Sequence, residues 1–147
     1  MESNQTVSTL LVPAAGLGTR MLPGTKVLPK ELLPIVDRPI VQYGVEEAVR
    51  AGIRQVVLIT NPENKLTASH FSTDPVLEEA LTEKDKPELL ATLRALAAMA
   101  DVTSLPQAQP RALGGSCALA CLSRHLGVDA ALAAVGSGKR SFAAEAP

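Results

Sequence analysis

Aromatic residues and cysteine are scarce in this sequence. Aromatic side chains make up 2% of its 147 residues, and tryptophan is missing. Proteins that bind single-stranded nucleic acids stack the bases on aromatic rings, so the composition argues against that class. Two cysteines, Cys117 and Cys121, are too few for a disulfide framework. They would share one face of a helix, and we expect them to be buried free thiols.

Strong net charge and long apolar runs are also missing. The formal net charge is −1, which indicates no nucleic-acid or membrane partner. No apolar run approaches the ~20 residues that are needed to span a bilayer. Residues 1–5 lack the basic start and apolar stretch of a signal peptide. We therefore predict a cytoplasmic protein.

The composition that remains is that of a globular domain, with 46% hydrophobic and 20% charged residues. We predict a strand over residues 7–12, a long functional loop over 16–37, a helix over 39–51 with Pro39 in its first turn, and a strand over 55–60. Gly52 would end the helix. Strand, helix and strand in this order predict a parallel sheet and the α/β class.

The segment after residue 60 is predicted to be mainly helical. One or two short helices are expected over residues 63–86, and Pro87 opens an amphipathic helix. That helix carries Leu89, Leu93, Leu96 and Ala100 on one face, which we expect to lie in the core. A third strand is predicted over residues 102–105.

Residues 13–30 have the composition of a polyphosphate cradle. Gly16 and Gly18 let the backbone turn sharply and approach a ligand closely, while Arg20 and Lys30 are cations within reach. A dinucleotide fingerprint is excluded because Met21 stands in place of its third glycine. The P-loop pattern around residue 138 also fails, since it lacks the first glycine and the hydroxyl residue.

The motifs in this region resemble those of the bacterial sugar-1-phosphate nucleotidyltransferases. They read Gly16-Leu17-Gly18-Thr19-Arg20, then Pro23-Gly24-Thr25, then Lys30-Glu31-Leu32-Leu33-Pro34. Three details favour the uridylyl branch over the thymidylyl branch: Pro13-Ala14-Ala15, Lys30-Glu31, and Asp37-Arg38-Pro39 leading into Gln42-Tyr43 and Val45-Glu46-Glu47-Ala48. The resemblance is strong over residues 8–60, moderate to Gly114 and poor afterwards.

The resemblance implies a Rossmann-like three-layer αβα nucleotidyltransferase domain, here truncated after about three strands. Residues 1–114 would be its nucleotide-binding part. Residues 115–147 would be an Ala-rich tail that has left the family pattern through truncation or a shifted reading frame. The implied partners are UTP and glucose 1-phosphate, which react to UDP-glucose and pyrophosphate. Thymidylyl transfer and a non-catalytic nucleotide-binding fragment remain as alternatives.

The family reaction uses Mg²⁺ as cofactor. The aspartate pair that follows a later strand in the family is missing from this sequence, and the other metal ligands would lie beyond residue 147. No metal ligand is therefore assigned to this chain. Losing the later strands would expose a sheet edge, so we predict marginal stability and association into homo-oligomers.

The resemblance also implies roles for single residues. Arg20 and Lys30 would bind the triphosphate and the leaving pyrophosphate as catalytic cations. Glu31 would accept the N3–H of uracil, with a solvated surface charge as the alternative. Gln107, with Gln109 as a rival, would read the base beside Gly114. The nucleotide would further meet the backbone of Ala14, Ala15, Gly16, Leu17, Gly18 and Thr19.

Four other polar residues are expected to have no chemical role. Glu46 and Glu47 are assigned to a solvated helix face, His70 to packing or surface, and His125 has no partner in the sequence.

Overall fold

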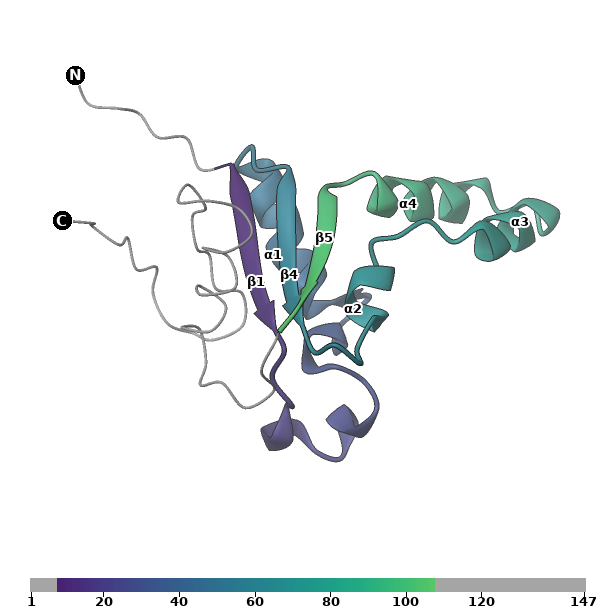
Figure 1. Ribbon diagram of the computed structural model, residues 1–147. Helices are drawn as coiled ribbons and strands as arrows, with labels where there is room; N and C mark the ends of the chain where they lie inside the picture. Colours follow the sequence, from purple (N-terminus) through teal and green to yellow (C-terminus); the bar gives the residue numbers. More distant parts are fainter. Residues whose placement is uncertain (1–7, 108–147) are drawn as a thin grey trace, which may run out of the picture.

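A three-stranded parallel sheet lies at the centre of the part of the chain that the structure describes, residues 8–107 of a computed structural model (Figure 1). Its strands are β1 (Thr9–Ala14), β4 (Gln55–Thr60) and β5 (Asp101–Pro106), in the order β1-β4-β5. The register aligns Ala14 with Thr60 and Thr60 with Pro106, so all three strands end at the same edge. The predicted α/β class with a parallel sheet is confirmed.

The first strand lies slightly further along the chain than predicted. It begins at Thr9 instead of residue 7 and ends at Ala14 instead of Val12. The reason is pairing, because Pro13 and Ala14 still lie opposite Ile59 and Thr60 of β4. The glycine-containing loop therefore starts directly at the carboxyl end of the sheet.

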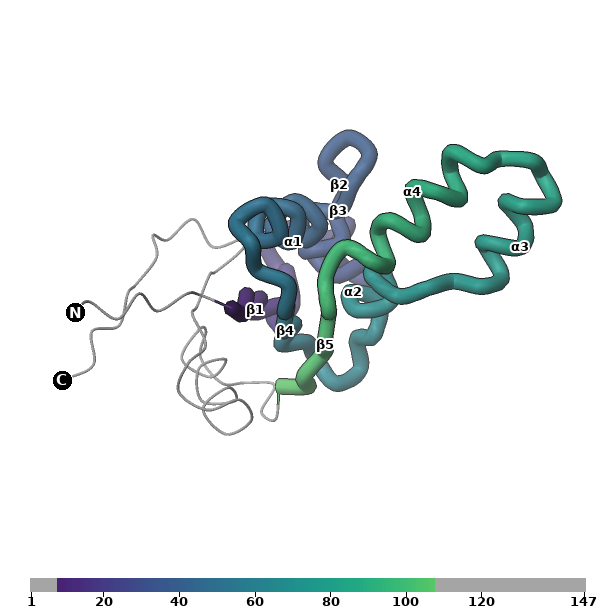
Figure 2. Tube along the Cα trace, turned by 90° about the horizontal axis from the view of Figure 1, so that it is seen from above, coloured from purple at the N-terminus to yellow at the C-terminus, as the bar shows by residue number. Residues whose placement is uncertain are grey.

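The helices of the described residues lie on one side of this sheet (Figure 2). Helix α1 (Ile40–Arg50) buries Val41, Val45 and Ala48 against Leu10 of β1 and Leu58 of β4. These residues form one apolar cluster with Phe71, which follows the short helix α2 (Leu66–Ser69). A second layer of helices, expected for a three-layer arrangement, is not found among residues 8–107.

Helix α1 is preceded by a small hairpin that the sequence did not predict. Strands β2 (Pro34–Ile35) and β3 (Arg38–Pro39) pair antiparallel, and the two residues between them form a turn with Val36 at φ 63°. Pro39 is therefore extended at the N-cap of α1. The prediction that it lies in the first turn of the helix is wrong. The end of the helix is confirmed, since Gly52 follows it at φ 89°.

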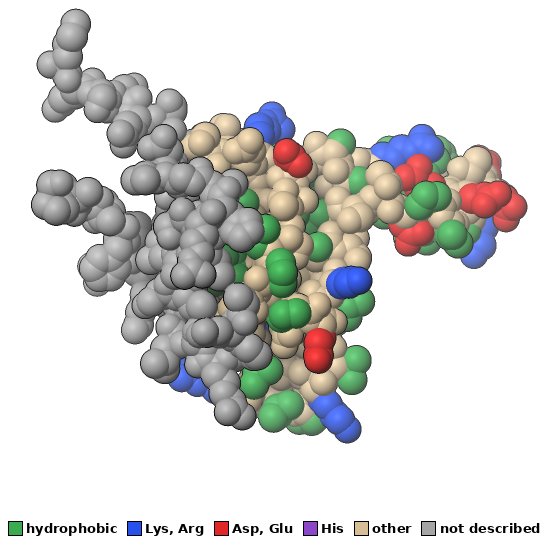
Figure 3. Space-filling view, in the orientation of Figure 1, with side chains coloured by type: hydrophobic (Ala, Val, Ile, Leu, Met, Phe, Trp, Pro, Cys, Tyr) green, Lys and Arg blue, Asp and Glu red, His purple; other side chains and the backbone are tan. Residues whose placement is uncertain are grey.

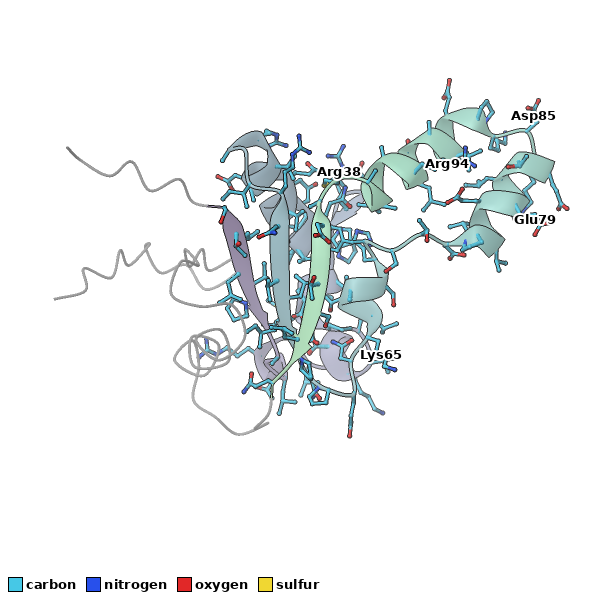
Figure 4. All side chains as sticks on the ribbon, turned by 45° about the horizontal axis from the view of Figure 1, so that its top comes forward. Arg38, Lys65, Glu79, Asp85 and Arg94 are labelled. Carbon is cyan, nitrogen blue, oxygen red and sulfur yellow. The ribbon has the colours of Figure 1, made fainter. Side chains whose placement is uncertain are left out.

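A pair of helices extends away from the sheet. Helices α3 (Pro75–Glu83) and α4 (Pro87–Ala97) pack against each other, and Arg94 Nε binds Glu78 Oε2 across them at 2.8 Å. Glu79 and Asp85 lie at the outer part of this pair and point away from the sheet (Figure 4). Side chains of both charges gather there (Figure 3).

The predicted buried face of α4 is wrong at Leu89, whose side chain is 56% exposed. Only the end of the helix reaches the apolar cluster, through Leu96 and then Met99 and Ala100. The spacing of apolar residues predicts which side chains of a helix share a face. It does not predict whether that face packs against the sheet, and most of α4 does not.

Of the two α1 glutamates that were assigned to a solvated face, only Glu46 is held by other side chains. The Glu46 side chain is 12% exposed and accepts hydrogen bonds from Arg38, Gln42 and Arg50 at 2.9–3.2 Å, so its assignment to solvent was wrong. Glu46 and then Asp37 raise the pKa of the Arg38 guanidinium. Glu47 is exposed, as predicted.

His70 has the packing role that we expected. Its ring meets Phe71 edge-on with the centroids 5.0 Å apart, and its Nε2 lies 3.0 Å from Gln42 Oε1. Burial lowers the pKa of its imidazole. His125 lies outside the described residues.

Candidate functional site

The loop that leaves β1 is shaped by its two glycines. Gly18 adopts the left-handed conformation, with φ 64° and ψ 26°, which glycine tolerates far better than other residues. Its carbonyl accepts a hydrogen bond from Met21 N at 2.9 Å, which closes the first short turn, η1 (Thr19–Met21). A second turn, η2 (Gly24–Lys26), and a third, η3 (Lys30–Leu32), bring the chain back to the start of the loop.

Lys30 returns to lie over Gly16. A Cβ built on Gly16 would be 3.4 Å from Lys30 Nζ and 3.8 Å from its Cε, so the ammonium lies directly beside this backbone. The Lys30 side chain is 34% exposed and forms an ion pair with Glu31 Oε2 at 3.2 Å. The structure thus brings together the glycine loop and a cation, as the motif predicted.

Glu31 is the only charged residue among those the structure reports as buried within residues 8–107, at 8% exposure. One of its oxygens binds Lys30, while Oε1 is buried with no hydrogen-bond partner in that part of the chain. A buried carboxylate oxygen without a donor is costly, and it calls for a partner such as a water molecule, an ion or a ligand group. The alternative of a solvated surface charge is therefore wrong for Glu31.

Lys30 and Glu31 line a small cavity of about 70 Å³. Its other walls are Val12, Pro13, Met21, Ile40 and Val41. Pockets for whole ligands measure about 300–1,000 Å³. The cavity can therefore admit an edge of a ring or a small polar group, and the remainder of a nucleotide would have to lie across the open loop.

Arg20 lies on η1 and is exposed. Its guanidinium makes no hydrogen bond or ion pair with any residue in the described range, so the structure does not join it to Lys30 or Glu31. It is a cation available to an anionic ligand. Of the remaining loop positions, Ala14 is buried, Ala15 is half-buried, and Leu17 is 72% exposed.

Gln107 lies beside the end of β4, at the same edge of the sheet as the glycine loop. Its backbone N–H donates to Thr60 O at 2.9 Å, directly after β5 ends at Pro106. This places residue 107 at the carboxyl ends of the strands, where ligands bind in open α/β sheets. The rival Gln109, and Gly114, lie outside the described residues.

A polar contact of Thr25 was not predicted. Thr25 Oγ1 donates a hydrogen bond to Gly18 O at 2.7 Å. The Pro-x-Thr motif, Pro23-Gly24-Thr25, placed Thr25 among the motif residues but did not predict its partner. Its partner is a backbone atom seven residues earlier, so the contact depends on the path of the loop.

The described residues do not supply a metal site. No group of three or more His, Cys, Asp or Glu side chains within residues 8–107 could hold a metal ion. Glu31 is a single carboxylate, and Lys30 already occupies one of its oxygens. The expected Mg²⁺ thus has no ligand set in this part of the chain. Nor does that part contain a helix long and apolar enough to cross a membrane.

Comparisons with known proteins identify the family of the chain. Residues 10–118 match the family described as nucleotidyl transferase. The chain is 46% identical over 108 residues to a UTP–glucose-1-phosphate uridylyltransferase of Bacillus subtilis, and 42% identical over 108 residues to one of Staphylococcus haemolyticus. The aligned region covers 74% of this chain but only 37% and 38% of those proteins, so the chain spans well under half of their length.

Solved structures are similar over most of the chain. A UDP-glucose pyrophosphorylase from Acinetobacter baumannii superimposes with a TM-score of 0.78 and 36% identity, covering 88% of this chain and 45% of the other. A UTP-bound structure from that organism gives a TM-score of 0.75 at 38% identity, covering 81% and 41%. Because the family match covers residues 10–118 and the relatives share 42–46% of their aligned residues with this chain, the chain belongs to the nucleotidyl transferase family.

Proposed function

We propose that the chain binds UTP at the glycine loop and is the nucleotide-binding part of a UTP–glucose-1-phosphate uridylyltransferase. The observation that carries the proposal is the buried, unpartnered Glu31 Oε1 next to Lys30, which lies over Gly16. Support comes from the relatives, which are named as uridylyltransferases, and from a similar structure described as UTP-bound.

In this reaction a phosphate oxygen of glucose 1-phosphate attacks the α-phosphorus of UTP in line. The bond to the β-phosphate breaks, and pyrophosphate leaves with its electron pair. Little covalent chemistry falls to the protein, which contributes position and positive charge. The described residues lack a Mg²⁺ site, so no step is assigned to the metal. Magnesium, the cytoplasmic location and the division of the chain at Gly114 stay predictions.

Arg20 and Lys30 supply the positive charge. Arg20 is exposed and not engaged by another residue of the described range, so its planar guanidinium is free to hold two phosphate oxygens at once. Lys30 places a point charge over the Gly16 backbone, where the phosphate chain would run. Backbone N–H groups from Ala15 to Thr19 would complete the cradle, next to Ala14 at the end of β1.

Glu31 would hold the base. Glu31 lines a cavity with mainly apolar walls, and its Oε1 is an acceptor without a partner among the described residues, which suits a ring that offers one N–H donor. Uracil offers such a donor at N3. Thymine offers the same donor, so Glu31 alone does not separate UTP from dTTP. Gln107 is our candidate for a second contact to the base.

The test is calorimetric binding of UTP and dTTP to the full 147-residue chain, with and without Mg²⁺. Because a charge-assisted contact contributes about 1.5–3 kcal/mol, Arg20→Ala and Lys30→Ala should each weaken UTP binding about 10-fold to 100-fold. Glu31→Gln should weaken UTP binding too, but it should not weaken binding of inorganic pyrophosphate, because it removes an anion beside Lys30.

Two surface cations serve as controls. Arg94 lies on α4, and Lys65 lies beside α2 with its side chain directed away from the sheet (Figure 4). Arg94→Ala and Lys65→Ala should leave UTP binding unchanged. A folded chain that binds no UTP, or equal losses in the loop and control variants, would contradict the proposal.

A further inference from the structure

Thr25 differs from its neighbours in the loop. Each of the other residues from 19 to 27 is exposed, whereas Thr25 is half-buried. Its hydroxyl donates to Gly18 O at 2.7 Å, a usual length for a good O–H···O hydrogen bond. Thr25 therefore ties the second turn of the loop to the glycine that begins the first.

The carbonyl of Gly18 is held from two sides, by Thr25 Oγ1 and by Met21 N at 2.9 Å. A peptide unit is planar and trans, so its N–H points opposite to its C=O. Fixing Gly18 O therefore fixes the direction of the Thr19 N–H. Glycine can change its backbone angles readily, so without such a restraint this peptide unit could turn over.

Close packing adds to the restraint. A Cβ on Gly18 would lie 3.2 Å from Thr25 Cβ and Cγ2, and 3.3 Å from Lys30 Cβ. Thr25 and Lys30 therefore border the same Cα, and the stem of the cation meets the residue whose carbonyl Thr25 holds. The hydroxyl, the glycine and the lysine form one packed unit.

We propose that Thr25 is a positioning residue for phosphate binding, whose hydroxyl keeps the Gly18–Thr19 peptide turned so that the Thr19 N–H is offered to the ligand. The inference rests on the proposed function and adds a role outside the cations and the base contact. Donors that are already oriented bind an anion without the cost of ordering them first.

Thr25→Val and Thr25→Ser form a matched pair for the test. Valine keeps the branched shape and removes the donor, while serine keeps the donor and removes a methyl group. We expect Thr25→Val to weaken binding of UTP and of inorganic pyrophosphate about 5-fold to 10-fold, the loss of one hydrogen bond. Thr25→Ser should stay within about twofold of the unmodified chain, and uridine, which has no phosphate, should bind all three equally.

Thr82→Val is the control for losing a hydroxyl. Thr82 Oγ1 also donates to a backbone carbonyl, that of Glu78 at 2.8 Å, but in helix α3. This variant should bind UTP normally. A merely structural role of Thr25 would lower uridine and UTP binding by the same factor, and that result would overturn the proposal, as would unchanged pyrophosphate binding in Thr25→Val.

Failure of the proposed function gives a different result. If the unmodified chain binds neither UTP nor pyrophosphate, the proposed nucleotide site is wrong. Amide hydrogen exchange then tests by itself whether the Thr25 hydroxyl holds the Gly18 carbonyl. Exchange of the Met21 N–H, which shares the Gly18 carbonyl, should be faster in Thr25→Val than in Thr25→Ser. Equal exchange rates in the two variants would show that the Thr25 hydroxyl does not hold the Gly18 carbonyl.

Discussion

At the scale of single residues, the kinds of groups at the site could be predicted, while some of their contacts could not. Gly16, Gly18, Lys30 and Glu31 stand in a motif whose residue types suit a phosphate cradle, and the structure brings them together. The Thr25 contact depends on how three short turns return the chain on itself. No local pattern encodes that path, so it could not be predicted.

Gly16 provides a direct test of the space in the cradle. In Gly16→Ala the added methyl group would lie 3.4 Å from Lys30 Nζ, where a phosphate oxygen would otherwise approach. We expect UTP binding to fall about 10-fold, because an apolar group displaces a charge-assisted contact. Calorimetry measures the affinity. Gly24→Ala is the matched control, since no atom beyond the adjacent residues lies within 4 Å of its Cβ position. Equal affinities of the two variants would show that ligand does not approach Gly16.

At the scale of elements, strand β4 and the start of α4 lie where the sequence predicted them. Their signals are local: branched residues bounded by Asn61-Pro62, and a proline that can only open a helix. The β2–β3 hairpin was missed because each strand has two residues, too few for any periodic pattern. Its turn also lacks the glycine that would have indicated it.

Val36 in that turn should be destabilising. Its φ of 63° is unfavourable for a branched residue, and its side chain is 95% exposed, so it gains little from packing. Val36→Gly should raise the free energy of unfolding by about 1 kcal/mol and the melting temperature by about 2–4 °C. Thermal unfolding followed by circular dichroism measures both.

Val27→Gly is the control for the effect of glycine itself. Val27 is also exposed, at 81%, but has an ordinary φ of −118°. Glycine there removes no strain and makes the unfolded chain freer, so stability should fall slightly. Equal changes at positions 36 and 27 would show that the turn is not strained.

At the scale of the whole molecule, the parallel sheet followed from the order of strand, helix and strand. The placement of the helices around the sheet could not be predicted. Amphipathic spacing shows that a helix has an apolar face, but it does not show which element that face packs against. Within residues 8–107, β1 and β5 are the outer strands and each pairs only with β4. Outer strands present unpaired backbone groups that can pair with another chain.

We expect self-association through β5, whose residues are exposed or half-buried. Thr103→Lys places a charge on this strand and should reduce association several-fold, because a charged outer strand resists pairing. Sedimentation velocity at several concentrations measures it. Thr73→Lys, at an exposed position outside the sheet, should associate like the unmodified chain. A chain that stays monomeric at all concentrations would rule out the association.

The α3–α4 pair has a consequence for how this chain can change over evolutionary time. Its principal packing is internal, α3 against α4, and only the end of α4 meets the apolar cluster under the sheet. Mutations and insertions near Asp85, at its far end, would therefore leave the nucleotide loop undisturbed (Figure 4). Selection on nucleotide binding should constrain residues 13–30 tightly while the outer half of this helix pair drifts in sequence and length.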